Sequence, residues 1–158
     1  MGSTRCNSAL QNEPTHSFSD RTSHINMKYI RWFITLAYAA GIFYLSSRQW
    51  GGVPLFPYAD KIIHFMLYAG LAFLCAWSLR VTETYGHAMM PILAVGLATS
   101  YGAIDEIHQF FVPGRSCETL DLLADAAGAA FGALMALQAA KCCRRRRAAE
   151  ADETGGGR

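Results

Sequence analysis

Residues 101–125 read YGAIDEIHQFFVPGRSCETLDLLAD, and this stretch decides the fold. It sets eight polar side chains between two strongly apolar segments. A charge at the centre of a bilayer costs at least about 2.5–3.5 kcal/mol on insertion scales, so ionisable groups do not gather between apolar helices without a reason. We interpret the stretch as one polar site at a membrane surface, the deeper part of which lies inside a helical bundle. The eight side chains belong to Asp105, Glu106, His108, Gln109, Arg115, Glu118, Asp121 and Asp125.

The composition favours a membrane protein of one domain. Of the 158 residues, 52% are hydrophobic and only 16% are charged, against about 25% charged in an average soluble domain. The net charge of +2 is small, and we expect no nucleic-acid partner. The five cysteines form no C-x-x-C pair and are odd in number, which argues against a disulfide framework.

Four apolar segments alternate with short polar or Gly/Pro-containing loops. Each holds roughly 17–22 residues, about what a bilayer core of ~30 Å requires. Segments of this length in a soluble protein would show a polar face, and these mostly do not. The sequence therefore predicts an all-α fold, a bundle of four transmembrane helices. They run from about Tyr29 to Ser47, Asp60 to Leu79, Ala88 to Phe110 and Thr119 to Ala140.

Polar segments flank this predicted bundle. Residues 1–26 are rich in Ser, Thr, Asn and His without apolar periodicity, so we expect a disordered tail. Met27 begins a sequence typical of a membrane-protein start, and we hypothesise that translation begins there. The transmembrane domain then covers residues 27–140, and residues 141–158 form a basic cytoplasmic tail.

The positions of Lys and Arg predict the orientation. With four spans, both termini lie on one side, and that side carries eleven of the 14 Lys and Arg residues. Only Arg48, Lys61 and Arg115 lie on the other. The positive-inside rule therefore places both termini in the cytoplasm. The polar stretch then faces outward from a bacterial inner membrane, in contact with the lipid bilayer.

Helical spacing aligns the polar residues into stripes. Side chains three and four positions apart share one face of a helix, and the three polar stripes all sit at the outer ends of their segments. In a four-helix bundle these stripes should converge. They comprise Asp60, His64 and Tyr68, then Tyr101, Asp105 and His108 with Gln109 beside them, then Glu118, Asp121 and Asp125.

Roles follow from residue chemistry. Asp105 or Glu106 together with His108 supplies a candidate catalytic acid and base. Arg115 offers a planar fork for a phosphate or carboxylate. Structural roles are also open for three of these residues. Asp60 can cap the start of a helix, His64 can pack in the core, and Arg115 can neutralise the nearby acids. The candidate binding residues are Asp60, His64, Gln109, Arg115, Asp121 and Asp125.

Metal ligands and helix-packing motifs are the remaining signals. His64, His108 and the carboxylates are plausible metal ligands, but no H-E-x-x-H motif or Cys pair is present, so we expect no metal and no cofactor. Gly128 and Gly132 form a G-x-x-x-G motif, which is typical of close helix packing. The same face would also suit a homo-oligomer.

Two segments resemble a known family. The run AIDEIHQFFVPGRSCETLDLLADAAGAAFGA at 103–133 and the run DKIIHFMLYAGLAFL at 60–74 are similar to the VanZ-like membrane proteins. Relatives often carry Asn where this chain has Asp125, which argues against a role that needs a neutral amide there. The resemblance implies a small multi-helix bacterial protein, and some relatives are tied to low-level resistance to teicoplanin-type glycopeptides. It assigns no reaction.

Three functions compete at this point. The first is a non-enzymatic envelope protein that binds a lipid, an anionic or lipid-linked envelope ligand, or a partner, and so alters antibiotic access. The second is a membrane enzyme acting on an envelope lipid or lipid-linked glycan. The third is a small proton-coupled transporter that uses His64 and Asp125 inside the membrane. Nothing in the sequence separates the first two.

Overall fold

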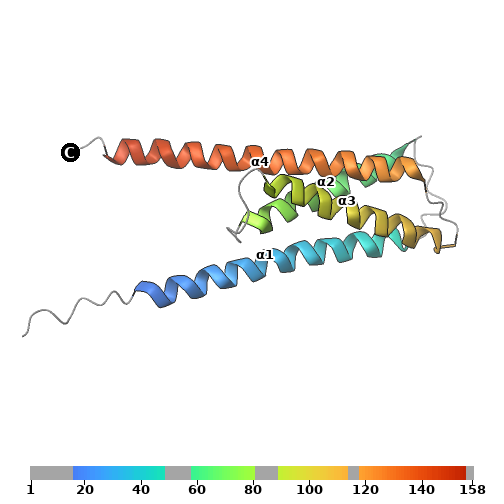
Figure 1. The fold of residues 1–158 in the computed structure, drawn as a ribbon, viewed down its shortest axis with the longest axis horizontal. Helices are drawn as coiled ribbons and strands as arrows, with labels where there is room; N and C mark the ends of the chain where they lie inside the picture. Colours follow the sequence, from blue (N-terminus) through green and yellow to red (C-terminus); the bar gives the residue numbers. More distant parts are fainter. Residues whose placement is uncertain (1–15, 49–57, 81–88, 114–117, 156–158) are drawn as a thin grey trace, which may run out of the picture.

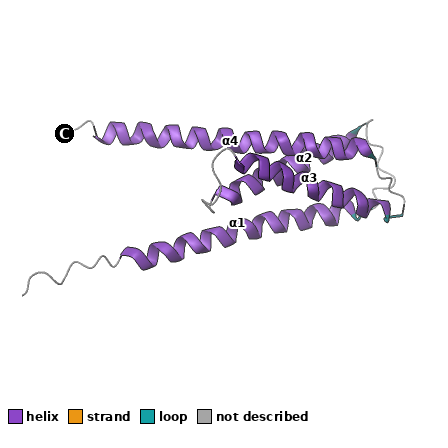
Figure 2. Cartoon of the chain, in the orientation of Figure 1, coloured by secondary structure: helices purple, strands orange, loops and turns teal. Residues whose placement is uncertain are grey.

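A computed structural model describes residues 16–48, 58–80, 89–113 and 118–155 of the chain, and Figure 1 shows their arrangement. Within these ranges the chain forms four α-helices and no strand (Figure 2). The all-α prediction with four helices is confirmed. The helices are α1 (His16–Ser46), α2 (Ala59–Leu79), α3 (Met89–Phe110) and α4 (Thr119–Gly155).

The two terminal helices are longer than expected. Helix α1 begins at His16, so residues 16–26 differ from the expected disordered tail. Helix α4 continues beyond Ala140 to Gly155. Extending an existing helix costs far less than nucleating a new one, and the Ala, Arg and Glu residues that follow Ala140 are good helix formers. Composition alone therefore underestimates how far these helices run.

Helices α2 and α4 make the most extensive contact in the bundle. Gly128 and Gly132 lie where α4 meets α2, and a Cβ on either would overlap the backbone carbonyl of Phe65 or Ala69. Only glycine allows the backbones to come this close. The G-x-x-x-G motif thus serves packing within the chain, and a homo-oligomer through this face stays a prediction.

Small buried residues and a few interhelical hydrogen bonds hold the other helices together. Ala94 and Ala98 of α3 are fully buried in the same core as Ala129 of α4. The hydroxyl of Tyr101 donates to the Ala39 carbonyl at 2.8 Å, which joins α3 to α1. Thr35 Oγ1 lies 2.9 Å from Ser78 Oγ, which joins α1 to α2.

The outer surface of the bundle is apolar. Large side chains face outward, including Phe33 at 73% exposure and Met66 at 62%, and soluble monomers rarely expose so continuous an apolar surface. Among the described residues, two helices are long and apolar enough to cross a membrane, over Ala59–Leu79 and Thr119–Thr154. These features indicate a membrane protein.

Candidate functional site

The polar residues of three helices meet at one end of the bundle, where α2 begins, α3 ends and α4 begins. Figure 1 shows these helix ends side by side. Several of the predicted site residues that meet here are buried. They are His64 of α2, Asp105, Glu106 and Gln109 of α3, and Asp121 and Asp125 of α4.

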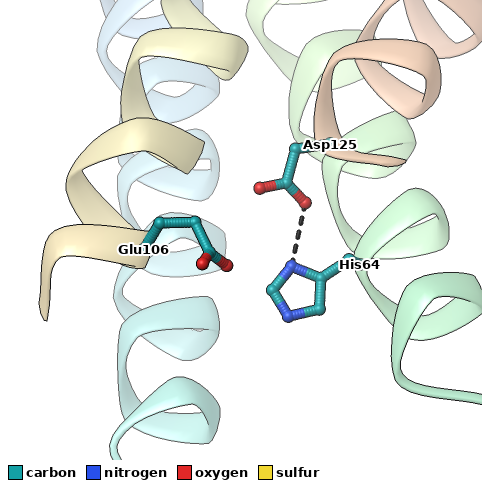
Figure 3. Close-up of side chains that lie close together, drawn as sticks. All are labelled: His64, Glu106 and Asp125. Atoms are coloured by element: carbon teal, nitrogen blue, oxygen red, sulfur yellow. Dashed lines mark hydrogen bonds and ion pairs between the residues drawn. The ribbon is translucent and has the colours of Figure 1, made fainter. Parts of the chain in front are cut away.

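His64 and Asp125 form the centre of the site. The Nδ1 atom of His64 lies 2.9 Å from Oδ1 of Asp125, and their side chains are 8% and 0% exposed. Glu106 approaches from α3 on the opposite side, as Figure 3 shows. One nitrogen or oxygen atom from each of His64, Glu106 and Asp125 lies within 4.8 Å of the other two. We call these three residues the buried triad.

Polar and aromatic neighbours surround the buried triad. Gln109 Nε2 donates to Oδ2 of Asp105 at 3.1 Å, and the ring of Tyr68 stacks beside His64 with 6.2 Å between centroids. The backbone N–H of Glu118 donates to Glu106 Oε2 at 3.2 Å. Tyr68 follows His64 by four residues and therefore lies on the same helical face, as the predicted stripe of Asp60, His64 and Tyr68 had it.

The carboxylate of Asp125 is enclosed against α3. A Cβ placed on Gly102 would lie 2.6 Å from Oδ2 of Asp125, so α3 can pass this carboxylate only because residue 102 is glycine. Within the described part of the chain, Oδ2 of Asp125 and Oδ1 of Asp105 have no hydrogen-bond partner. Both atoms are buried. The site therefore holds acceptor oxygens that a bound donor or cation would satisfy.

A second cluster lies around Lys61. Its ammonium contacts Asp60 at 3.0 Å, Glu118 at 2.8 Å and Asp121 at 3.0 Å. We call these four residues the Lys61 cluster. Asp121 is buried, whereas Asp60 and Glu118 are about half exposed, so the cluster forms the outer rim of the site. Lys61 was not among the predicted site residues, although the excess of acids at this end of the bundle is a signal that could have pointed to it.

His108 lies apart from the buried triad. Its Nε2 is 3.0 Å from Ser47 Oγ, and its ring packs on Phe43 of α1 at 4.4 Å. Successive helix residues are rotated by about 100°, which turns Asp105, Glu106 and Gln109 inward and leaves His108 at the edge of that face. Arg115 lies outside the described residues, so its predicted anion-binding role stays a prediction.

The buried triad suits proton transfer. When the His64 ring is neutral and donates its Nδ1 proton to Asp125, Nε2 becomes an acceptor, which is the arrangement of a base oriented by a carboxylate. The side chain of Glu106 reaches toward the same ring (Figure 3). Three ligand-capable residues on three helices also form a possible cation site.

A known family model matches most of the chain. The family model described as VanZ/LLP1 matches residues 5–140, which span all of α1, α2 and α3 and most of α4. No curated protein and no solved structure matches the chain. The matched region contains both the buried triad and the Lys61 cluster.

Proposed function

The chain belongs to the VanZ/LLP1 family, and we propose that it is a multi-pass protein of the bacterial inner membrane in which all four helices cross the bilayer. Outward-facing apolar side chains on α1 and α3 support this proposal. Phe33 of α1 is 73% exposed, and Ile92 and Ile107 of α3 are 62% and 61% exposed. Lipid would cover these side chains, while water would leave them as an aggregation hazard.

Both termini then lie in the cytoplasm, and the buried triad lies toward the outer face. The distribution of arginine supports this orientation. Arg31, Arg80, Arg144 and Arg147 line one hollow at the end of the bundle opposite the site, where they would meet the anionic lipid of the cytoplasmic leaflet. Arg80 and Arg144 lie near enough for their charges to influence one another. The acids of the site gather at the other end.

The site binds the polar part of an envelope lipid or a lipid-linked ligand. The observation that carries this proposal is the set of buried acceptor oxygens that converge from α3 and α4, with Oδ2 of Asp125 among them. Carboxylates accept hydrogen bonds from hydroxyl, amide and ammonium groups. The ligand part that reaches them therefore carries such donors. The role predicted for Arg115 from the sequence is to bind an anionic part of the ligand. Binding of this kind would alter teicoplanin access at the outer face.

Native-lipid copurification tests the binding role. The wild-type protein extracted into lipid nanodiscs should retain a specific envelope lipid, and Asp125→Asn together with Glu106→Gln should release it. Gly96→Ala is the matched control, because nothing lies within 4 Å of a Cβ at that position. If wild type, the double variant and Gly96→Ala all retain the same lipids, these residues do not form a specific lipid-binding site. Teicoplanin susceptibility should change in both the deletion strain and the double-variant strain.

An enzyme is the second candidate, and the His64–Asp125 contact favours it. A base held by a carboxylate is a recurring part of hydrolytic and transfer sites. In this reading His64 is the base, Asp125 orients it, and Glu106 or Asp105 is the acid. Lipid and muropeptide profiles separate the candidates. A new chemical species shared by the deletion and the His64→Gln strain indicates catalysis, whereas a change in bound lipid alone indicates binding.

A further inference from the structure

Three buried carboxylates lie at the inner end of the site, and two of them keep an oxygen atom without a hydrogen-bond partner among the described residues, Oδ1 of Asp105 and Oδ2 of Asp125. Asp105, Glu106 and Asp125 are 3%, 4% and 0% exposed. Buried charges in proteins are paired, or they coordinate metals, because an isolated buried ion is very costly. Lys61 directs its ammonium to the rim carboxylates of its own cluster. His64 contacts Asp125 through Oδ1, so a cation at the buried triad would satisfy the second oxygen of that carboxylate, Oδ2.

The donor set around this point is that of a metal centre. An imidazole nitrogen and two carboxylate oxygens, from His64, Glu106 and Asp125, lie within 4.8 Å of one another. Metal–ligand bonds of about 2.0–2.2 Å place tetrahedral ligands about 3.4 Å apart. Side-chain rotation that draws the atoms together by about 1 Å would therefore close the site around an ion.

A second observation points to the same place. Oδ2 of Asp125 is buried without a hydrogen-bond partner among the described residues, and it faces α3 at Gly102. Figure 3 shows this oxygen on the side of Asp125 from which Glu106 approaches. The backbone N–H of Glu118 holds Glu106 through Oε2, which is how proteins orient a ligating carboxylate.

We propose that His64, Glu106 and Asp125 bind one divalent first-row transition-metal ion. Imidazole together with carboxylates suits ions such as Zn²⁺ and Mn²⁺. The ion takes the place of the direct His64–Asp125 hydrogen bond, and its open coordination positions accept water or a ligand oxygen. This inference revises the expectation of no metal. The sequence carries no metal motif because each ligand comes from a different helix.

The other acidic group is not a metal site of this kind. Asp60, Glu118 and Asp121 also lie close enough to surround an ion, but the ammonium of Lys61 occupies the space between them with contacts of 2.8–3.0 Å. At the buried triad, by contrast, Oδ2 of Asp125 has no hydrogen-bond partner among the described residues. We therefore expect a metal ion at the buried triad and none at the Lys61 cluster. Variants of the Lys61 cluster can serve as controls.

Metal binding is tested on the full chain in detergent, and the test does not depend on lipid binding. The protein is stripped with a chelator and dialysed against Zn²⁺, Mn²⁺ or Co²⁺ separately, and bound metal is measured by mass spectrometry. We expect about one ion per chain for at least one metal. His64→Gln, Glu106→Gln and Asp125→Asn should each weaken binding at least about tenfold. Glu118→Gln and His108→Gln should retain the ion.

Two further measurements distinguish a loss of metal binding from a loss of folding. X-ray absorption of the loaded wild-type protein should show an imidazole nitrogen together with oxygen ligands. Bound metal should also raise the thermal midpoint of wild type and of His108→Gln, but not that of Asp125→Asn. A wild type that binds no equivalent of any of the three ions overturns the proposal. A coordination shell that lacks an imidazole nitrogen would also contradict the proposal. So would a His64→Gln variant that binds the metal as tightly as wild type.

Discussion

Nδ1 of His64 lies 2.9 Å from Oδ1 of Asp125, and this contact joins α2 to α4 inside the bundle. It places an ionisable pair where the surrounding helices exclude water, since the two side chains are 8% and 0% exposed. Glu106 of α3 approaches the same pair (Figure 3). Side chains of three helices therefore lie close together in one buried site.

Replacing one partner of the His64–Asp125 pair should destabilise the fold more than replacing both. Removing one member of a buried pair costs about 3–5 kcal/mol because the other stays buried without compensation. His64→Leu should therefore lower the free energy of unfolding strongly. The double variant His64→Leu/Asp125→Leu should recover part of the loss, with a coupling of about 0.5–3 kcal/mol. Denaturant unfolding in detergent measures this, and additive losses would show that the pair is not coupled.

Within the Lys61 cluster, the buried contact should matter most. Asp121 is 6% exposed, whereas Asp60 and Glu118 are 48% and 45% exposed. Exposed pairs contribute about 0–1 kcal/mol, while a hydrogen bond to a buried charged group contributes about 1.5–3 kcal/mol. Asp121→Asn should therefore lower the thermal midpoint more than Glu118→Gln does. Equal shifts for both variants would contradict this ranking.

Alanine at the packing glycines should disrupt the contact between α2 and α4. A Cβ at Gly128 or Gly132 would overlap backbone atoms of α2, which cannot move aside as a side chain can. Each substitution should cost about 1–3 kcal/mol or more. Gly41→Ala and Gly96→Ala are matched controls with nothing within 4 Å, and they should be neutral or stabilise by about 0.5–1 kcal/mol. Thermal unfolding of the four variants in detergent is the measurement.

Cysteine labelling should report the orientation of the chain. A membrane-impermeant maleimide should label a single-cysteine variant that retains Cys117 in intact cells. Variants that retain only Cys142 or Cys143 should stay unlabelled until the cells are opened, although both residues are exposed on α4. The reason is that the arginine-rich end is held in the cytoplasm. The reverse labelling pattern would invert the proposed topology and place the buried triad toward the cytoplasm.

The order of residues was enough to predict the two central helices and the polar ends of the bundle. Segments expected at about 60–79 and 88–110 correspond to α2 (Ala59–Leu79) and α3 (Met89–Phe110), because apolar runs and loop residues act over a few neighbouring positions. The spacing of Asp121 and Asp125 also placed both on one face of α4, and both are buried. These features depend on local geometry, which the order of residues fixes directly.

Which polar groups meet depends on how the helices pack against one another. The rotation of α3 turned Glu106 toward His64 and placed His108 against Phe43. Lys61 became the centre of three carboxylates that lie up to 60 residues away in the chain. The axial and rotational positions of packed helices depend on contacts between distant segments, here the approach of α4 to α2 at Gly128. Helical periodicity assigns a residue to a face, but it cannot tell which neighbouring helix that face will contact.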